Sequence, residues 1–473
     1  MSMINKIAAM SLAVMLAFTV MAPTSALAQS QHQQIVEHYG GEYDPDGLGR
    51  YVRGIVERLE PHANLDQPIR HVTVLNSAVV NAFATPEGGV YVTRGIIALC
   101  NSEDELAGII GHEIGHVVES HGQGRQGISV LAGLMGLALQ AAGVGELGML
   151  GYNVGANLGL SSYSREQEAE SDRLGVRYLH RAGYDPYALH DFFRSMDRAA
   201  NLAQASTGEE GYMPRMDFFS THPNTEGRIE ATYDRARRKG VAEGEIARTR
   251  NGFLDEIDGM MYGDGDDQGF VRGRNFYHTQ LDFTFRVPEG YDIQNGDTQV
   301  VAYHDDGSAI IFDLAQQDSQ RGMGGYVRQD FSQELGVQLE NVQTFTVNGF
   351  SAASGQAIVT QNSQQRQVLA VAYDAGNGRV YRFVMSGPRS RKSDIDRGWI
   401  DTMDSFDDLS GHDVDGLHAL SIDVVRVRRR DTVERLANRM AFDDMQERRF
   451  RVLNGLERDD TLERGTRVKL VVD

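Results

Sequence analysis

The sequence predicts a multidomain protein in which a mainly α-helical domain with a small β-sheet precedes an α+β domain and a short β-α-α-β module. The length of 473 residues exceeds that of an ordinary single domain, and a hydrophobic content of 41% is enough for several cores. Helical spacing of apolar residues dominates residues 29–262, and strand patterns dominate residues 271–410. Both patterns occur in residues 418–473. We expect these three ranges to be the domains.

Residues 1–28 are predicted to be a secretory signal peptide. Lys6 supplies a short positive region, Ile7–Met21 are mostly apolar, and Ala26–Ala28 fit a small-x-small cleavage site. We therefore expect an exported protein, with the periplasm as its compartment. Cys100 is the only cysteine, so an internal disulfide is excluded and the cores must hold the fold.

The formal net charge of −20 at pH 7 argues against nucleic acid as a partner, and against an anionic membrane surface as the main partner. Phosphate groups repel a chain of this sign. The simplest interpretation of the acidic excess is that it keeps the chain soluble.

The first domain begins with helical spacing over residues 31–62, followed by strand patterns over residues 71–75, 79–84 and 90–93. A Pro-Glu-Gly-Gly turn joins the last two strands as a hairpin. The edge of a hairpin can hold an extended peptide by strand addition, so Asn81, Phe83 and Val90 are candidate substrate-binding residues. An ordinary small sheet without a substrate is the alternative.

The next helix is predicted over residues 102–121, SEDELAGIIGHEIGHVVESH, with Ser102 and Glu105 as a capping box. His112 and His116 are four residues apart, which brings both imidazoles to one face. Two ring nitrogens there can bind one Zn²⁺ ion, and Glu113 lies beside them as a base for an attacking water. With 14 histidines in the chain, the bare pattern arises by chance in roughly a few per cent of such chains, so the context decides.

The residues after this helix argue against a site built from three histidines of one motif. Gly122 stands where that class has its third histidine. His121 is one residue short and points from another face of the helix, so we expect it to be structural. The third ligand should then come from a second helix.

That second helix is predicted to begin at Ser164, which can form a capping box with Gln167. Glu168 and Asp172 are four residues apart and share one face. One carboxylate can bind the ion, and the other can accept the free ring N–H of a ligand histidine. The alternative is a solvated acidic helix surface.

The order of these motifs is specific. It runs Asn81-Ala-Phe83, Val92-Thr-Arg-Gly95, His112-Glu-x-x-His116, Glu168-x-x-x-Asp172, Ser220-Thr-His-Pro223 and Arg228. Over roughly residues 30–240 it resembles the CAAX prenyl protease/HtpX family of zinc metalloendopeptidases, in the periplasmic BepA-like branch. The resemblance implies a zincin-type (gluzincin) protease domain that holds one Zn²⁺ ion through His112, His116 and Glu168.

The resemblance also assigns the remaining roles. Glu113 is the base, and Asp172 matches a conserved acid that acts either as a proton donor or, as we favour, as the partner that orients a ligand histidine. Arg228 matches a further motif position and is a candidate substrate-binding residue. His222 approaches the metal from a loop, because Pro223 disfavours helix before it. There it either blocks the fourth position, which makes the enzyme latent, or stabilises the oxyanion; a loop histidine without metal contact is the alternative.

Two uncharged runs, Gln126–Gly145 and Leu147–Ser164, separate the two motif helices. The apolar part of the first run, Ile128–Val144, is shorter than the about 20 residues that a membrane span needs. We therefore favour glycine-rich helices packed over the site, with peripheral membrane contact as the alternative. After a helix end at Gly183, a helix is expected from Asp185-Pro186 to Met196. A loop or lid over 197–219 and helix over 225–260 are expected to follow.

An acidic linker at residues 263–269 precedes the second unit. Strand patterns are predicted over residues 283–287, 299–303, 309–313, 342–347, 354–359, 368–373 and 380–385, with helices over 326–335 and 393–406. The pattern resembles a PsbP or Mog-type fold. Without a catalytic motif, this unit is expected to have a binding or structural role.

The last unit resembles a LysM module. A strand is predicted over residues 423–429, Asp431-Thr432 caps a helix, a second helix ends near Leu453, and a final strand follows. Peptidoglycan is the ligand that this resemblance implies, although Arg430 replaces the usual glycine, so a plain β-α-α-β cap is the alternative. We interpret the Arg428–Arg430 cluster as a solvated edge that discourages sheet pairing.

Taken together, the sequence predicts an exported zinc metalloendopeptidase. Its expected substrates are extended polypeptides, namely unfolded or misassembled envelope proteins, and its expected partners include peptidoglycan and the outer-membrane assembly machinery. The alternative is a latent or non-catalytic, chaperone-like protein that binds peptidoglycan.

Overall fold

The computed structural model describes residues 31–120, 163–205, 216, 218, 222, 226–296, 299–304, 306–316, 321–361, 364–412, 414, 416–442 and 444–473. The predictions for the signal peptide, for His121 and for most of residues 126–164 lie outside these ranges. Within the described residues, no helix combines the length and the apolarity needed to cross a bilayer.

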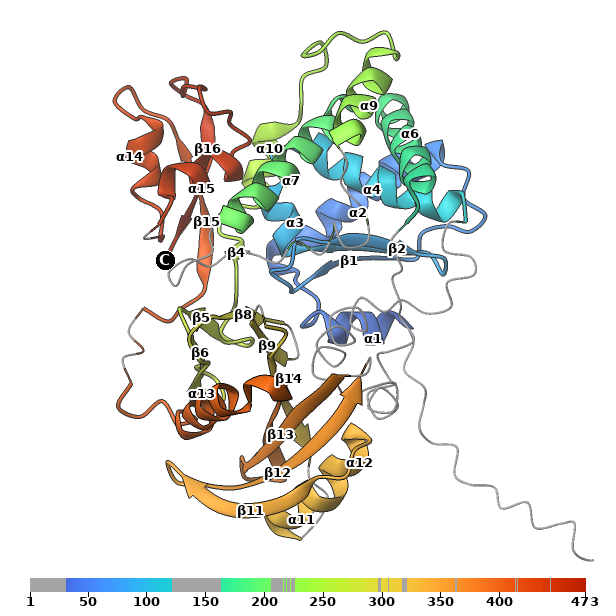
Figure 1. The fold of residues 1–473 in the computed structure, drawn as a ribbon. Helices are drawn as coiled ribbons and strands as arrows, with labels where there is room; N and C mark the ends of the chain where they lie inside the picture. The colour runs from blue at the N-terminus through green and yellow to red at the C-terminus, as the bar shows by residue number, and fades with distance from the viewer. Residues whose placement is uncertain are drawn as a thin grey trace, which may run out of the picture.

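The N-terminal domain is a small mixed sheet sandwiched between helices (Figure 1). Its elements are α1 (Gln31–His38), α2 (Leu48–Leu59), β1 (His71–Leu75), β2 (Ala82–Thr85), β3 (Gly89–Thr93), α3 (Arg94–Leu99), α4 (Glu103–Val118), α6 (Arg165–Ala182), α7 (Ala188–Ala205), α9 (Glu226–Arg237) and α10 (Arg250–Glu256). Strand β3 is central, parallel to β1 and antiparallel to β2. Helix α1 covers one face, and the other helices build the main core on the opposite face.

Three predicted helices have different bounds in the structure. The helix expected over residues 31–62 is broken, because Gly40 and Gly41 adopt φ angles of 73° and 100° that end α1. The helix expected over residues 225–260 is likewise two helices, α9 and α10. Helix α7 continues to Ala205 instead of ending at Met196, so part of the expected loop is helical. Its extra turns bury Ala199 and Leu202 in the core.

Glycines let the two motif helices approach closely. A Cβ atom at Gly115 of α4 would lie 3.2 Å from the Cα of Ser171 in α6. A Cβ atom at Gly175 would lie 3.2 Å from the backbone nitrogen of His112. The predicted capping box of Ser164 and Gln167 is present, and Gly183 ends α6 in the left-handed conformation. The glycine contacts set the distance between α4 and α6, and the capping box sets the residue at which α6 begins. Together they determine where the acidic face of α6 meets the histidines of α4.

The middle of the chain forms an α+β unit around a seven-stranded antiparallel sheet of order β11-β12-β13-β14-β10-β9-β8. Its elements are β5 (Phe270–Arg272), β6 (Asn275–His278), β7 (Phe283–Arg286), β8 (Tyr291–Asn295), β9 (Gln299–His304), β10 (Ala309–Gln316), α11 (Gly322–Tyr326), α12 (Ser332–Leu335), β11 (Glu340–Val347), β12 (Phe350–Gln361), β13 (Gln364–Asp374), β14 (Arg379–Pro388) and α13 (Lys392–Asp404). Separate apolar clusters lie on its two faces. Every predicted strand is present, and sequence analysis missed β5, β6 and β8.

The C-terminal module has the predicted β-α-α-β order: β15 (Leu420–Arg426), α14 (Val433–Ala437), α15 (Gln446–Leu453) and β16 (Arg467–Val472). It is built onto the N-terminal domain, because β15 pairs with β16 on one side and with β4 (Met261–Tyr262) on the other. The buried ammonium of Lys469 donates to the backbone oxygens of Ala98 and Cys100, at 2.7 and 2.6 Å. The LysM identity stays a prediction.

Candidate metal centre

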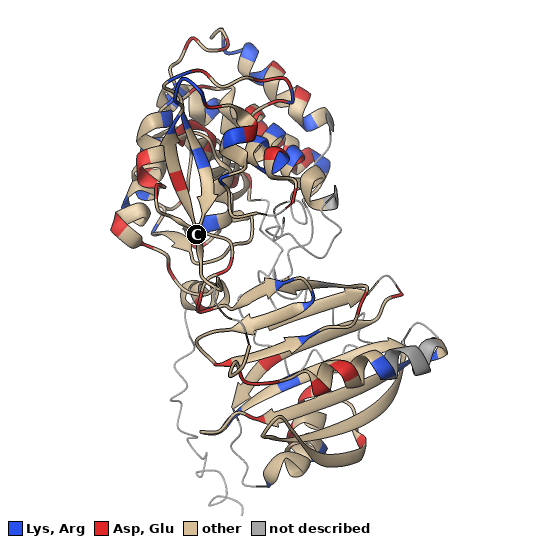
Figure 2. Cartoon of the chain, turned by 90° about the vertical axis from the view of Figure 1, so that its left-hand side faces the viewer, with Lys and Arg blue, Asp and Glu red and all other residues tan. Residues whose placement is uncertain are grey.

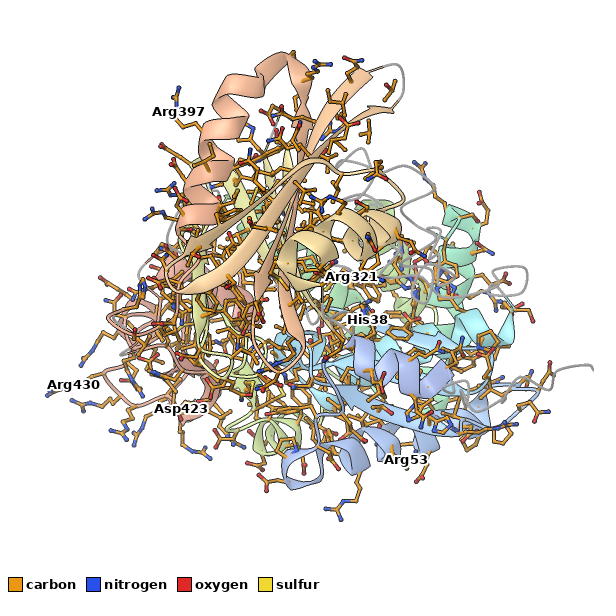
Figure 3. All side chains as sticks on the ribbon, turned by 90° about the horizontal axis from the view of Figure 1, so that it is seen from below. His38, Arg53, Arg321, Arg397, Asp423 and Arg430 are labelled. Carbon is orange, nitrogen blue, oxygen red and sulfur yellow. The ribbon has the colours of Figure 1, made fainter. Side chains whose placement is uncertain are left out.

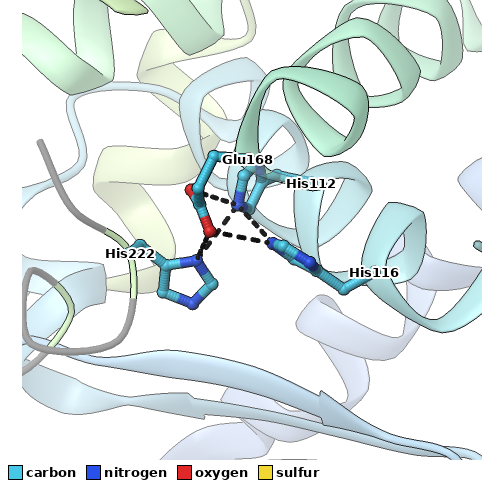
Figure 4. A group of neighbouring side chains, drawn as sticks. All are labelled: His112, His116, Glu168 and His222. Atoms are coloured by element: carbon cyan, nitrogen blue, oxygen red, sulfur yellow. Dashed lines mark hydrogen bonds and ion pairs between the residues drawn. The ribbon is translucent and has the colours of Figure 1, made fainter. Parts of the chain in front are cut away.

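Helix α4 presents two imidazoles to one buried point (Figure 4). The Nε2 atoms of His112 and His116 lie 3.0 Å apart, and both residues are at most 3% exposed. The four-residue spacing on a helix places them this way, because residues four apart stand one above the other. Ser102 caps the helix by accepting from the backbone nitrogen of Glu105.

Two further residues bring their side chains to the same point. Glu168 comes from the first turn of α6. His222 lies outside the helices, and its backbone nitrogen donates to the oxygen of Phe218. The Oε1 atom of Glu168 lies 3.4 Å from His116 Nε2 and 2.9 Å from His222 Nδ1. His222 Nδ1 is also 3.3 Å from His112 Nε2.

These separations fit a zinc ion. Four donors around a tetrahedral ion at about 2.1 Å lie about 3.4 Å from one another. Four of the donor pairs of this group are 2.9 to 3.4 Å apart, and all of its donors lie within 4.8 Å of one another. Three nitrogens and one carboxylate oxygen are also the donor types that zinc prefers. Within the described residues, His112, His116, Glu168 and His222 form the one cluster with metal-site geometry.

An ion-paired arginine stands behind the ligands. Asp172 Oδ1 lies 3.0 Å from the Nδ1 of His112, the ring nitrogen that faces away from the centre. Arg228 donates through Nε and Nη2 to both oxygens of Asp172, at 3.0 and 2.7 Å. Its Nη1 lies 2.7 Å from Glu168 Oε2. One buried guanidinium therefore holds both carboxylates, and Asp172 in turn fixes the ring of His112.

The ionisation of these groups follows from burial and charge. Burial lowers the pKa of His116 well below its usual value, which favours the neutral form that ligates. Burial opposes ionisation of the Asp172 and Glu168 carboxyls. For Asp172, Arg228 and His112 outweigh burial and hold the pKa below its usual value. For Glu168, the three histidines of the group do the same. For His112, the partner carboxylates outweigh burial and raise the pKa.

Glu113 lies in the same pocket and is 2% exposed. Burial raises the pKa of its carboxyl, while His222 and His112 oppose that change. Its Oε1 lies 3.5 Å from Nε2 of His222. A carboxyl with an elevated pKa beside a metal group suits a general base near neutral pH.

The candidate substrate-binding residues are more scattered. Asn81 is buried just before β2 and donates to the hydroxyl of Tyr39 at 3.3 Å. Phe83 packs with Tyr39 and Tyr91 on the α1 side of the sheet. Val90 is fully buried on the central strand β3, whose backbone is paired on both sides. Arg228 lies with the metal group.

Three aromatic residues of the site escaped sequence analysis. Tyr163 stacks on His116 with ring centroids 3.7 Å apart, and Phe218 stacks on His222 at 4.3 Å. Phe193 of α7 lies under the guanidinium of Arg228, with 4.6 Å to the ring centroid. Tyr163 and Phe193 each pack against a polar residue more than 30 positions away, so no motif spacing marks them. Phe218 is four residues before His222, but no metal motif includes that position.

A pair of histidines one helical turn apart, a glutamate from a second helix and an adjacent buried carboxylate on a small mixed sheet define a metallopeptidase-type domain. The family model described as peptidase family M48 matches residues 48–236. This domain of the chain therefore belongs to peptidase family M48, and zinc is its cofactor.

Curated relatives share this domain. The beta-barrel assembly-enhancing protease of Yersinia pestis is 29% identical over 206 residues, which cover 41% of this chain and 40% of that protein. The mitochondrial metalloendopeptidase OMA1 of Schizosaccharomyces pombe is 29% identical over 212 residues, covering 43% of this chain and 58% of that protein. The chain thus spans less than two thirds of the length of these relatives.

Among solved structures, cyanobacterial PsbP (CyanoP) from Synechocystis is similar at 15% identity, covering 28% of this chain and 89% of that chain, with a TM-score of 0.23. A score of that size carries no conclusion. The PsbP or Mog-type resemblance of residues 271–410 therefore stays a prediction.

Proposed function

We propose that the N-terminal domain is a zinc-dependent endopeptidase that cleaves extended polypeptides. The observation that carries the proposal is the convergence of His112, His116 and Glu168 beside Glu113 in one buried group. Neither motif helix holds such a set alone, and packing of α4 against α6 is what assembles it.

When bound, the zinc ion polarises the scissile carbonyl and makes a water molecule more acidic. Glu113 accepts a proton from the attacking water and passes it to the leaving amine. Asp172 and Arg228 act behind the ligands: Asp172 holds the ring of His112, and Arg228 balances the charge of both carboxylates. We therefore propose that Arg228 is a positioning residue, and we assign the orienting role to Asp172.

We propose that the substrate adds as a strand beside β2. This strand is an edge of the sheet, and it lies next to α4 in the fold (Figure 1). Asn81 and Phe83 would serve through the main chain around β2, since both side chains are buried. We leave Val90 out of the proposed surface, because β3 has no free edge.

The wider role is proposed from the sequence and from the relatives. We propose an exported, periplasmic protein that acts on unfolded or misassembled envelope proteins. A relative named for enhancing β-barrel assembly supports contact with the outer-membrane assembly machinery. Peptidoglycan binding through the LysM-like module, residues 418–473, is part of the same proposal, and a pull-down of the full chain with insoluble peptidoglycan tests it.

The proposed activity is tested by casein cleavage with the wild type and with Glu113→Gln. The substitution keeps the shape of the side chain and removes the base, so we expect cleavage to fall at least about 100-fold with zinc content unchanged. Glu57→Gln, at an exposed position of α2, is the matched control and should retain activity. A wild type that holds zinc but leaves casein intact would reject the proposal for this substrate.

A latent resting state is the second candidate, and the position of His222 favours it. Its Nδ1 lies 3.3 Å from His112 Nε2 and 2.9 Å from Glu168 Oε1, which are separations expected between two ligands of one ion. Its Nε2 lies 3.5 Å from Glu113 Oε1. In addition, the backbone nitrogen of Phe218 donates to Val80 at 3.1 Å, just before β2. We therefore propose that His222 fills the fourth ligand position in the resting state, while Phe218 is bonded to the start of the proposed substrate edge.

A further inference from the structure

The C-terminal module carries a basic groove at the end of β15, far along the chain from the metal group. The groove has a volume of about 860 Å³ and is open to solvent. Its charged lining consists of Arg426, Arg428, Arg429, Arg439, Arg464 and Asp431. All five arginines are exposed, and Figure 2 shows blue loops gathered at this end of the module.

The protein itself leaves most of this charge uncompensated. Asp431 accepts from the backbone nitrogen of Arg428 at 2.7 Å, so it serves the turn as a cap. Arg439 lies 3.6 Å from Asp423, both partly exposed, and Arg426 donates to the oxygen of Gly465. No carboxylate among the described residues pairs with the guanidinium groups of Arg428, Arg429 or Arg464.

This local charge stands against the sign of the whole chain. The chain carries 66 acidic against 46 basic residues, whereas residues 418–473 carry 13 basic against 11 acidic ones. An acidic protein with one basic end approaches a negative surface with that end first, because the remainder is repelled. Figure 3 places Arg430 at the outer margin of the molecule. Arg428 and Arg429, which precede it in the chain, are exposed as well, so a flat surface can reach them.

We propose that this groove binds phosphate-bearing lipid headgroups and so orients the protease on an anionic membrane surface. Guanidinium groups match phosphate oxygens through paired hydrogen bonds, and five of them around one open groove suit several phosphates displayed together. An uncharged glycan would leave these arginines without a counter-charge. On this proposal Arg428 and Arg429 bind a ligand, which differs from the sequence-based interpretation of Arg428–Arg430 as a solvated edge. The proposal does not depend on the peptidase activity.

The test is sedimentation of the purified full chain with lipid vesicles at about 0.1 M salt, where charges act over about 10 Å. Wild type should sediment with vesicles that contain phosphatidylglycerol and stay in solution with phosphatidylcholine alone. The triple variant Arg428→Ala, Arg429→Ala and Arg464→Ala should bind about 100-fold more weakly, at about fivefold per arginine. The phosphate headgroup could belong to a phospholipid or to a phosphorylated glycolipid, and vesicles that carry one or the other distinguish these two sources.

A matched control keeps the total charge change the same. The triple variant Arg286→Ala, Arg328→Ala and Arg397→Ala removes three exposed arginines from the α+β unit and should sediment like the wild type. The proposal fails if the groove variant binds as well as the wild type, or if both triple variants lose binding equally. It also fails if the wild type binds peptidoglycan through these arginines and ignores phosphatidylglycerol.

Discussion

Replacing Asp172 by Asn tests whether this residue orients a ligand or donates a proton. Both oxygens of Asp172 are already engaged, one with His112 and Arg228 and the other with Arg228. The amide has the same shape as the carboxylate, but it loses the charge that Arg228 pairs with. It also presents an N–H in place of one acceptor oxygen, so the ring of His112 loses its fixed orientation.

The expected magnitude follows from the place of Asp172 behind His112. Loss of a partner that fixes a ligand histidine typically lowers metal affinity 10- to 100-fold, which corresponds to about 1.4–2.7 kcal/mol. Because Arg228 still lies 2.7 Å from Glu168, the Glu168 carboxylate should stay in place and the site should weaken without collapsing. Peptidase activity at saturating zinc should therefore be largely restored.

The assay is a chelator competition for zinc, followed by casein cleavage across a zinc titration. Glu170→Gln removes the same charge from a partly exposed position of the same helix, where Glu170 pairs with Arg173, and we expect it to bind zinc like the wild type. If Asp172→Asn keeps wild-type zinc affinity and loses cleavage at every zinc concentration, Asp172 is a proton donor and our assignment is wrong.

Three further substitutions test other parts of the structure. If His222 blocks the fourth position and moving it away costs about 1.4 kcal/mol, His222→Ala should raise cleavage about tenfold. Unchanged or lower activity at unchanged zinc affinity would contradict latency. Gly115→Ala should destabilise by about 1–3 kcal/mol in urea unfolding, because its Cβ would meet Ser171, whereas Gly54→Ala, with open space around it, should not. Burial, reinforced by Arg250, lowers the pKa of Lys469 to about 7, so the unfolded chain binds more protons above that pH. The stability of the wild type relative to Lys469→Met should therefore rise from pH 7 towards pH 10, as measured by thermal unfolding, and a flat difference would argue against a perturbed lysine.

Local patterns predicted the motif helices well, because their determinants are close in sequence. The cap at Ser102, the four-residue histidine spacing and the box at Ser164 each depend on a few neighbouring residues. The helix face predicted that either Glu168 or Asp172 would be the third ligand, and the family resemblance selected Glu168. The sequence could not give the separation between the helices, since that depends on glycine contacts such as Gly115 on Ser171.

What was missed depends on partners that are distant in sequence. Helix α7 extends beyond Met196 because Ala199 and Leu202 are buried, and because Arg198 reaches Glu457 in the C-terminal module. Strand β4 is two residues long and exists only through its pairing with β15. The partners of residues 197–205 and 261–262 lie more than 150 positions away, so local periodicity in these two ranges could not predict the contacts.

These long-range contacts also change how the C-terminal module should be regarded. Ile422 and Val452 are part of the N-terminal core, so the module is not a flexibly tethered adaptor. Lys469 donates to the backbone oxygens of Ala98 and Cys100, and Cys100 lies two residues before Ser102, which caps the start of α4. A membrane that binds the basic groove would therefore also orient α4, because the C-terminal module contacts the N-terminal domain directly through these residues.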